Sequence, residues 1–236
     1  MRTAGRDRTA RWLLGGFLAL SAVHLAGQLA GGGLLAQLTK PALMPVLAAW
    51  SAARGGPRSL VVALLFGCGG DTLLMLGGNG PFLAGMGCFA AGHVVYITAF
   101  ARRGGLAAGR RTRAAAVLYG LGWATSLVTL GPSLGALRWP VAGYSLLLST
   151  MALSAAGLSV HTCAGGALFL LSDSLIAAGL AHWPQLPRPE FWIMLTYLGG
   201  QYLLATGLVA ARDVVPRGGN APPRAHVEAR VPPVQR

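Results

Sequence analysis

The chain has 236 residues, of which 54% are apolar and 11% are charged, and its formal net charge is +13. A soluble domain carries about 25% charged residues, so this composition leaves too little polar surface to cover a globule in water. It excludes an ordinary cytosolic enzyme, an intrinsically disordered chain and a disulfide-stapled secreted domain, and it indicates a polytopic α-helical membrane protein.

Apolar runs that could cross about 30 Å of hydrocarbon follow one another along the chain. They predict an all-α membrane bundle of about eight transmembrane helices, at Trp12–Ala30, Pro41–Ala53, Leu60–Leu76, Phe82–Ala101, Ala114–Leu130, Trp139–Leu158, Cys163–Ala181 and Phe191–Ala211. The second run is short, so it could be tilted, broken at Pro45 or partly re-entrant. We expect three parts: a basic N-terminal segment (1–11), a single transmembrane domain (12–211) and a disordered, Pro- and Arg-rich tail (212–236).

The basic residues mark one face of the membrane. Eight spans place sixteen of the nineteen on one side and leave only Lys40, Arg138 and Arg188 on the other. The positive-inside rule then predicts that both termini are cytoplasmic, in what we expect to be a bacterial plasma membrane. These basic residues could also bind anionic lipid headgroups. Nucleic acid is not an expected partner, because no basic stripe is interleaved with aromatic residues.

Residues 1–30 also carry the arginine-rich start and apolar stretch of a signal peptide, although the site that follows fits only loosely. Whether the first run is retained therefore stays open at the level of sequence.

Two of the six acidic residues, Asp71 and Asp173, stand inside apolar runs. A charged carboxylate there costs at least a few kcal/mol, so each needs a partner, a proton or a water-filled cavity. Each is followed by a hydroxyl residue and two aliphatics, which suggests a weak parallel repeat of two four-helix halves. The repeat would place both carboxyl groups at similar depth, facing each other across a central cavity. Gly67, Gly69 and Gly70 would permit close helix packing or the approach of a ligand. The alternative is a protonated aspartate that only hydrogen-bonds two helices.

Other polar residues cluster by helical spacing. His93 and Tyr96 are three residues apart, Tyr197 and Gln201 are four apart, and each spacing puts the pair on one helix face. Tyr144 lies near the outer end of the sixth run.

Lys40 is the only lysine in the chain, and it opens the second run at the outer boundary. It could be an interfacial lysine whose ammonium reaches the headgroups, a phosphate ligand, or the counter-ion of an aspartate.

No nucleophile elbow, zinc-protease motif, P-loop or metal-ligand spacing of cysteines occurs in the sequence. Serine hydrolysis, zinc proteolysis and ATP-driven pumping therefore have no support, and we expect no metal site.

Taken in order, these residues resemble the YhhN family of membrane proteins, whose characterised members are lysoplasmalogenases. The resemblance runs from about Thr39 to Ala210. Its landmarks are Thr39-Lys40-Pro41 with Met44-Pro45, Gly70-Asp71 with Leu73-Leu74-Met75, Phe82-Leu83-Ala84-Gly85, Gly92-His93-Val94-Val95-Tyr96 with Ala99-Phe100, Tyr144, Gly166-Ala167-Leu168-Phe169, Ser172-Asp173-Ser174, and Met194-Leu195-Thr196-Tyr197 with Gln201. The chain departs from the family's usual pattern at Leu198, where a second aromatic is common, and at Gly200, where alanine is usual.

The resemblance implies hydrolysis of the vinyl-ether bond of a lysophospholipid, which gives a fatty aldehyde and glycerophospho-ethanolamine or -choline. Vinyl ethers yield to acid, so a protonated carboxyl and a nearby anion suffice, and neither metal nor cofactor is required. We expect Asp71 and Asp173 to form this acid–base pair. Lys40 would meet the lipid phosphate, and the side chains that would orient the carboxyls and water are His93, Tyr96, Tyr144, Tyr197 and Gln201.

Two other classes fit the same residues. A proton-coupled transporter of a small molecule or lipid would also use intramembrane aspartates, and a non-catalytic assembly factor would use them only for packing. The sequence does not distinguish which aspartate donates the proton, which headgroup is preferred, or the oligomeric state.

Overall fold

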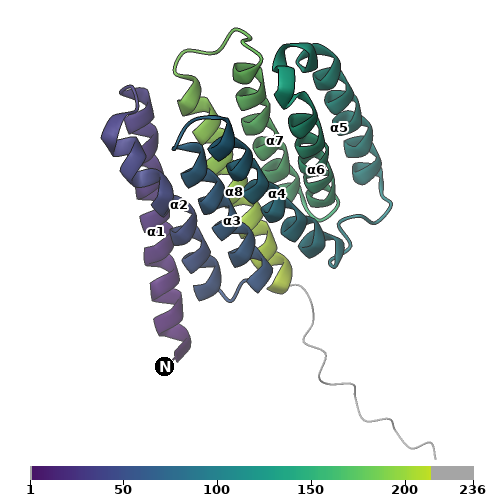
Figure 1. The fold of residues 1–236 in the computed structure, drawn as a ribbon. Coiled ribbons are helices and arrows are strands. Elements are labelled where there is room, and N and C mark those ends of the chain that lie inside the picture. Colours follow the sequence, from purple (N-terminus) through teal and green to yellow (C-terminus); the bar gives the residue numbers. More distant parts are fainter. Residues whose placement is uncertain (1, 214–236) are drawn as a thin grey trace, which may run out of the picture.

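A computed structural model describes residues 2–213 of the chain. Within them the chain forms eight α-helices and one 3-10 helix, without strands, as the all-α prediction requires (Figure 1). The elements are α1 (Arg2–Leu29), α2 (Gly33–Ala53), α3 (Arg58–Leu74), α4 (Asn79–Ala101), α5 (Arg110–Thr129), η1 (Gly131–Leu137), α6 (Arg138–Ala156), α7 (Val160–Leu180) and α8 (Pro189–Asp213). The tail that we predict to be disordered (212–236) lies outside the described residues, except for Arg212 and Asp213.

The long apolar helices make this an integral membrane protein. In the described part of the chain, α1, α4, α7 and α8 are each long and apolar enough to cross a membrane. Helix α5 and the η1–α6 segment meet at a bend of 79° and together form a fifth candidate. Helix α3 has only 17 residues and α2 is not among these candidates, so length and composition alone single out fewer spans than the eight predicted runs.

Helix α2 corrects the interpretation of the second run. It is one continuous helix of 21 residues with Pro41 and Pro45 inside it, so the chain is not broken at Pro45. The predicted run begins only at Pro41, because the polar residues Gln37, Thr39 and Lys40 interrupt the apolar pattern in the first two turns of the helix. Neighbouring helices allow such internal prolines within membranes. Helix α1 also begins earlier than the predicted run. It starts at Arg2 and not at Trp12, so it includes the basic N-terminal segment.

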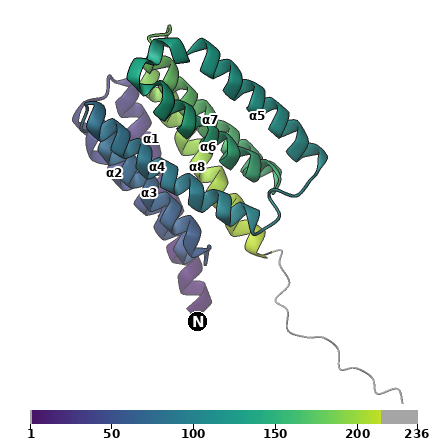
Figure 2. The same cartoon turned by 45° about the vertical axis from the view of Figure 1, so that its right-hand side comes forward.

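The helices pack mainly as sequential neighbours. Helix α1 packs on α2, α3 on α4, and α7 on α8, while α6 joins α4 to α7. Helix α5 lies at the edge of the bundle beside α6 (Figure 2). The first turns of α1 and the last turns of α8 lie at the same end of the bundle (Figure 1).

Small residues let α7 approach its neighbours closely. A Cβ atom on Gly200 of α8 would lie 3.0 Å from the Gly165 carbonyl oxygen, and one on Gly166 would lie 2.9 Å from the Cα atom of Ala152 in α6. Close backbone contact through small residues is a common means of helix association in membranes. It holds α7 against both α6 and α8 about two turns before Asp173.

Candidate active site

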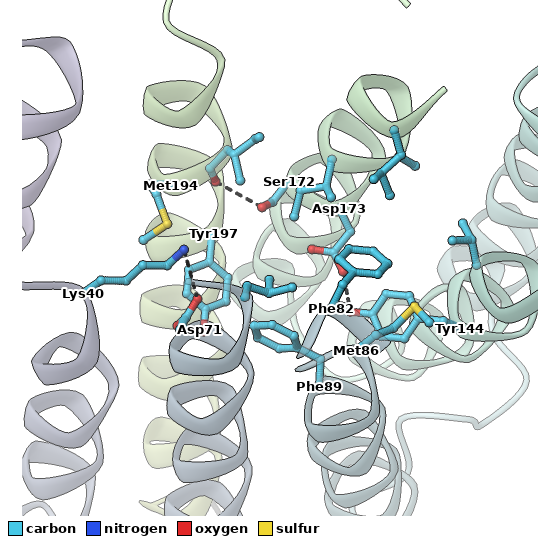
Figure 3. A pocket seen from close by; sticks show the side chains of 16 residues that line it. Lys40, Asp71, Phe82, Met86, Phe89, Tyr144, Ser172, Asp173, Met194 and Tyr197 are labelled. Carbon is cyan, nitrogen blue, oxygen red and sulfur yellow. Dashed lines mark hydrogen bonds and ion pairs between the residues drawn. The ribbon is translucent and has the colours of Figure 1, made fainter. Parts of the chain in front are cut away.

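A partly open cavity lies where α2, α3, α4, α6, α7 and α8 meet (Figure 3). It is at the end of the bundle where α8 begins, because Met194 and Tyr197 of the first turns of α8 line it. Its polar lining consists of Lys40, Asp71, Tyr144, Ser172, Asp173 and Tyr197. The two intramembrane carboxyl groups therefore border one cavity, Asp71 on the side of Lys40 and Tyr197 and Asp173 on the side of Tyr144 (Figure 3).

Asp71 faces a positive charge. It is only 3% exposed, and its Oδ1 atom lies 4.0 Å from Nζ of Lys40 across the α2–α3 interface. Its Oδ2 atom is buried and has no hydrogen-bond partner among the described residues. Of the interpretations of Lys40 that the sequence left open, this geometry is that of a counter-ion. It leaves one carboxylate oxygen able to accept a proton from a water molecule or a substrate.

Asp173 has a neutral hydrogen-bond donor instead. The Tyr144 hydroxyl donates to Oδ2 of Asp173. The same hydroxyl oxygen lies 3.1 Å from Nε2 of His93, so a neutral His93 with its proton on Nε2 donates to Tyr144. No ion pair involves Asp173 within residues 2–213. The chain His93–Tyr144–Asp173 joins α4, α6 and α7 and orients this carboxyl group.

A second hydrogen-bonded chain supports the Asp71 side. The Tyr96 hydroxyl donates to Oε1 of Gln201 over 2.8 Å, and Nε2 of Gln201 donates to the Tyr197 hydroxyl over 3.4 Å. All three side chains are buried. Gly67 makes room for them, since a Cβ atom there would lie 2.9 Å from the Tyr197 hydroxyl oxygen. This chain ends at Tyr197, beside Asp71 (Figure 3).

The eight residues singled out in the sequence thus gather around one cavity, but in two layers. Five of them line it: Lys40, Asp71, Tyr144, Asp173 and Tyr197. The other three lie behind it: His93 bonds to Tyr144, and Tyr96 bonds to Gln201, which bonds to Tyr197. His93 and Tyr96 share a face of α4, yet His93 bonds to α6 and Tyr96 bonds to α8. They therefore belong to two separate hydrogen-bond networks.

Sequence reasoning missed the apolar wall of the cavity. Phe82, Met86 and Phe89 of α4 line it, and their spacing of four and then three residues is that of one helix face. The same spacing leads on to His93 and Tyr96, so the face marked by these two polar residues was a signal in the sequence that could have identified this wall.

The comparison with known proteins agrees with the resemblance drawn from the residues. The model of the YhhN family matches residues 35–208, which is most of the chain. The chain belongs to the YhhN family. The matched region runs from the first turn of α2 almost to the end of α8, so it holds every residue of the site, and among the described helices it leaves out α1.

Among curated relatives, this YhhN-family chain is 32% identical over 214 residues to proteins named lysoplasmalogenase from Mycobacterium bovis and Mycobacterium tuberculosis. Each alignment covers 85% of this chain and 81% of the relative. A bovine (Bos taurus) lysoplasmalogenase is 34% identical over 169 residues, covering 66% of this chain and 67% of the relative. No solved structure matches the chain.

Proposed function

We propose that this protein is a lysoplasmalogenase, which hydrolyses the vinyl-ether bond of lysoplasmalogens to a fatty aldehyde and glycerophospho-ethanolamine or -choline. The names of its relatives support the reaction class. The observation that carries the mechanism is the unequal environment of two carboxyl groups bordering one cavity. Among the described residues, one faces an ammonium group and keeps an unpartnered oxygen, and the other has only a hydroxyl donor.

The reaction requires an acid and then a base. Protonation of the β-carbon of the vinyl ether makes an oxocarbenium ion, water adds to the carbon next to oxygen, and the water gives up a proton. The resulting hemiacetal collapses to the aldehyde and the glycerol hydroxyl group. Glycosidases divide the work of two carboxyls around a similar cation in the same way.

The geometry assigns these roles unequally. A neighbouring positive charge stabilises a carboxylate, so Asp71 beside Lys40 is the residue we assign as the anion that stabilises the cation and accepts the proton of water. Asp173 has no cationic partner in the described part of the chain, so we assign it as the general acid. Tyr144 holds one oxygen of Asp173, which leaves the other to carry the proton toward the substrate.

The remaining residues have supporting roles in this proposal. His93 orients Tyr144, while Tyr96 and Gln201 orient Tyr197 beside Asp71. The aromatic and aliphatic side chains of α4 that line the cavity would hold the start of the alkenyl chain.

A paired-substrate assay tests the proposal. Purified protein is incubated with a lysoplasmalogen and, separately, with the saturated lysophospholipid of the same headgroup, and aldehyde is measured. We expect aldehyde from the first substrate only. Asp71→Asn and Asp173→Asn should each lower its rate at least about a hundredfold, the usual scale of general acid–base catalysis. Asp7→Asn is the matched control, because exposed Asp7 pairs with Arg54 away from the cavity.

The second candidate function is a proton-coupled transporter, which the buried Lys40–Asp71 pair also suits. Uptake of a lysophospholipid into proteoliposomes without aldehyde formation would favour it over the hydrolase.

We also propose that the termini face the cytoplasm and that the membrane is the bacterial plasma membrane. The shared end of α1 and α8, together with the arginines in the loops at that end, supports this orientation (Figure 1). Labelling a cysteine introduced at Gly109, between α4 and α5, in intact and permeabilised cells would test it.

A further inference from the structure

A second cavity lies behind the first. It lies between α5, η1, α6 and α7 and is partly open. Four residues border both cavities: Val141, Tyr144, Asp173 and Ala177. The carboxyl group that we assign as the general acid therefore stands between two spaces.

Arg138 brings a cation to this second cavity. It is the first residue of α6, and its guanidinium group lies 5.0 Å from the ring centre of Trp139. Its Nε atom is buried and has no hydrogen-bond partner in the described part of the protein. Gly131 leaves space for it, since a Cβ atom at that position would lie 3.3 Å from this Nε atom. The Nε proton of this guanidinium group therefore lacks an acceptor among the described residues.

Arg138 and Lys40 differ in their partners. Lys40 faces Asp71, whereas Arg138 forms no ion pair within residues 2–213. A buried polar atom that lacks a partner is costly, so such an atom beside a cavity points to an acceptor that arrives with a ligand. The planar guanidinium group has a donor fork that matches two oxygens of a phosphate.

We propose that Arg138 binds the phosphodiester group of the lysophospholipid and that the second cavity receives the headgroup side of the substrate. This inference rests on the proposed function, because it takes its substrate class from there. The scissile bond then lies at Asp173, between the phosphodiester at Arg138 and the alkenyl chain against Phe82 and Phe89 of the first cavity. In this proposal Lys40 is the counter-ion of Asp71. Arg138, in place of Lys40, is the residue that contacts the phosphate.

The polar side chains of the second cavity fit this division. Besides Arg138, three serines line it: Ser126, Ser145 and Ser174. Each serine hydroxyl donates to a backbone carbonyl group of its own helix, at 2.7–3.1 Å, so its oxygen keeps lone pairs to accept a hydrogen bond. Acceptor oxygens suit the ammonium group of an ethanolamine headgroup.

The test compares two alkenyl substrates that differ only in the phosphoethanolamine group. Wild-type protein and Arg138→Gln are assayed with lysoplasmenylethanolamine and with the corresponding 1-O-alkenylglycerol, which lacks phosphate. We expect Arg138→Gln to raise the KM for the phospholipid by roughly tenfold to a hundredfold, the scale of a lost charge-assisted hydrogen bond. Its kcat/KM for the alkenylglycerol should match that of the wild type, and glycerophosphoethanolamine should no longer inhibit it.

Two further variants keep the test decisive. Arg138→Lys should recover part of the phospholipid KM, because the charge remains and the fork is lost. Arg188→Gln is the matched control on the same face, since the exposed Arg188 lines neither cavity, and it should behave as the wild type. Equal effects of Arg138→Gln on both substrates, or on neither, would overturn the assignment.

A binding measurement separates this inference from the hydrolase proposal. Saturated lysophosphatidylethanolamine has no vinyl ether, so its affinity for detergent-solubilised protein reports phosphate recognition without chemistry. Weaker binding to Arg138→Gln than to the wild type supports the site even if no aldehyde forms from any substrate. Equal binding to both proteins refutes the site even if the protein is an active lysoplasmalogenase.

Discussion

The Nζ atom of Lys40 lies 4.0 Å from Oδ1 of Asp71, and both side chains are largely buried. The pair joins α2 to α3 at the edge of the cavity, and it distinguishes Asp71 from Asp173, which has no cation beside it in the described structure. An ion pair in a low-dielectric site is costly to break, because the remaining charge is left without compensation.

Removing the charge of Lys40 should therefore impair Asp71. Lys40→Met keeps the length of the side chain and removes the ammonium group, and we expect at least a tenfold loss of kcat in aldehyde release. Lys40→Arg keeps the charge and should retain more activity than Lys40→Met. Steady-state rates with lysoplasmalogen check this, and full activity of Lys40→Met would contradict the role of Asp71 as the carboxylate.

Tyr144→Phe should slow catalysis without weakening binding. The change removes the hydroxyl that donates to Asp173 and accepts a hydrogen bond from His93, while the ring that lines both cavities stays. We expect kcat to fall roughly tenfold, about the worth of one hydrogen bond at the acid, with KM nearly unchanged. A raised KM with unchanged kcat would instead make Tyr144 a substrate-binding residue. Arg138→Gln is the matching comparison, because we expect it to raise KM whereas Tyr144→Phe lowers kcat.

Gly67→Ala should disturb the Tyr96–Gln201–Tyr197 chain. The new methyl group would lie 2.9 Å from the Tyr197 hydroxyl oxygen and 3.3 Å from Nε2 of Gln201, so these groups must shift. We expect a loss of activity together with a lower melting temperature. Gly87→Ala in α4 is the control, because nothing lies within 4 Å of its added methyl group, and it should keep full activity without lowering the melting temperature.

Helix α1 should contribute to stability although it precedes the region matched by the family model. Phe17 is 1% exposed, and its ring stacks on Tyr202 of α8 at 6.4 Å between centroids. Phe17→Ala should lower the unfolding free energy by roughly 1–3 kcal/mol, less than in a water-soluble core because lipid is itself apolar. Thermal unfolding in detergent measures it, with Leu18→Ala as the control, since Leu18 is 50% exposed. An unchanged melting temperature for Phe17→Ala would show that α1 does not stabilise the bundle.

The local properties of the chain could be read from the sequence. The scarcity of charge predicted a helical membrane bundle, and the cost of a charge in hydrocarbon singled out Asp71 and Asp173. Helical spacing correctly put Tyr197 and Gln201 on one face, where they share a hydrogen bond. Each of these inferences depends only on residues within a few turns of one another, or on composition.

Only the tertiary structure decided which partner each polar group has. Lys40 lies beside Asp71 rather than at a free boundary, Tyr144 pairs with Asp173, and His93 and Tyr96 diverge to α6 and α8. The second cavity and the unpartnered Nε atom of Arg138 are equally invisible in the sequence. These pairings depend on the rotation and tilt of each helix, which are set by close contacts between distant small residues such as Gly165 and Gly200, and no periodicity within one segment encodes them.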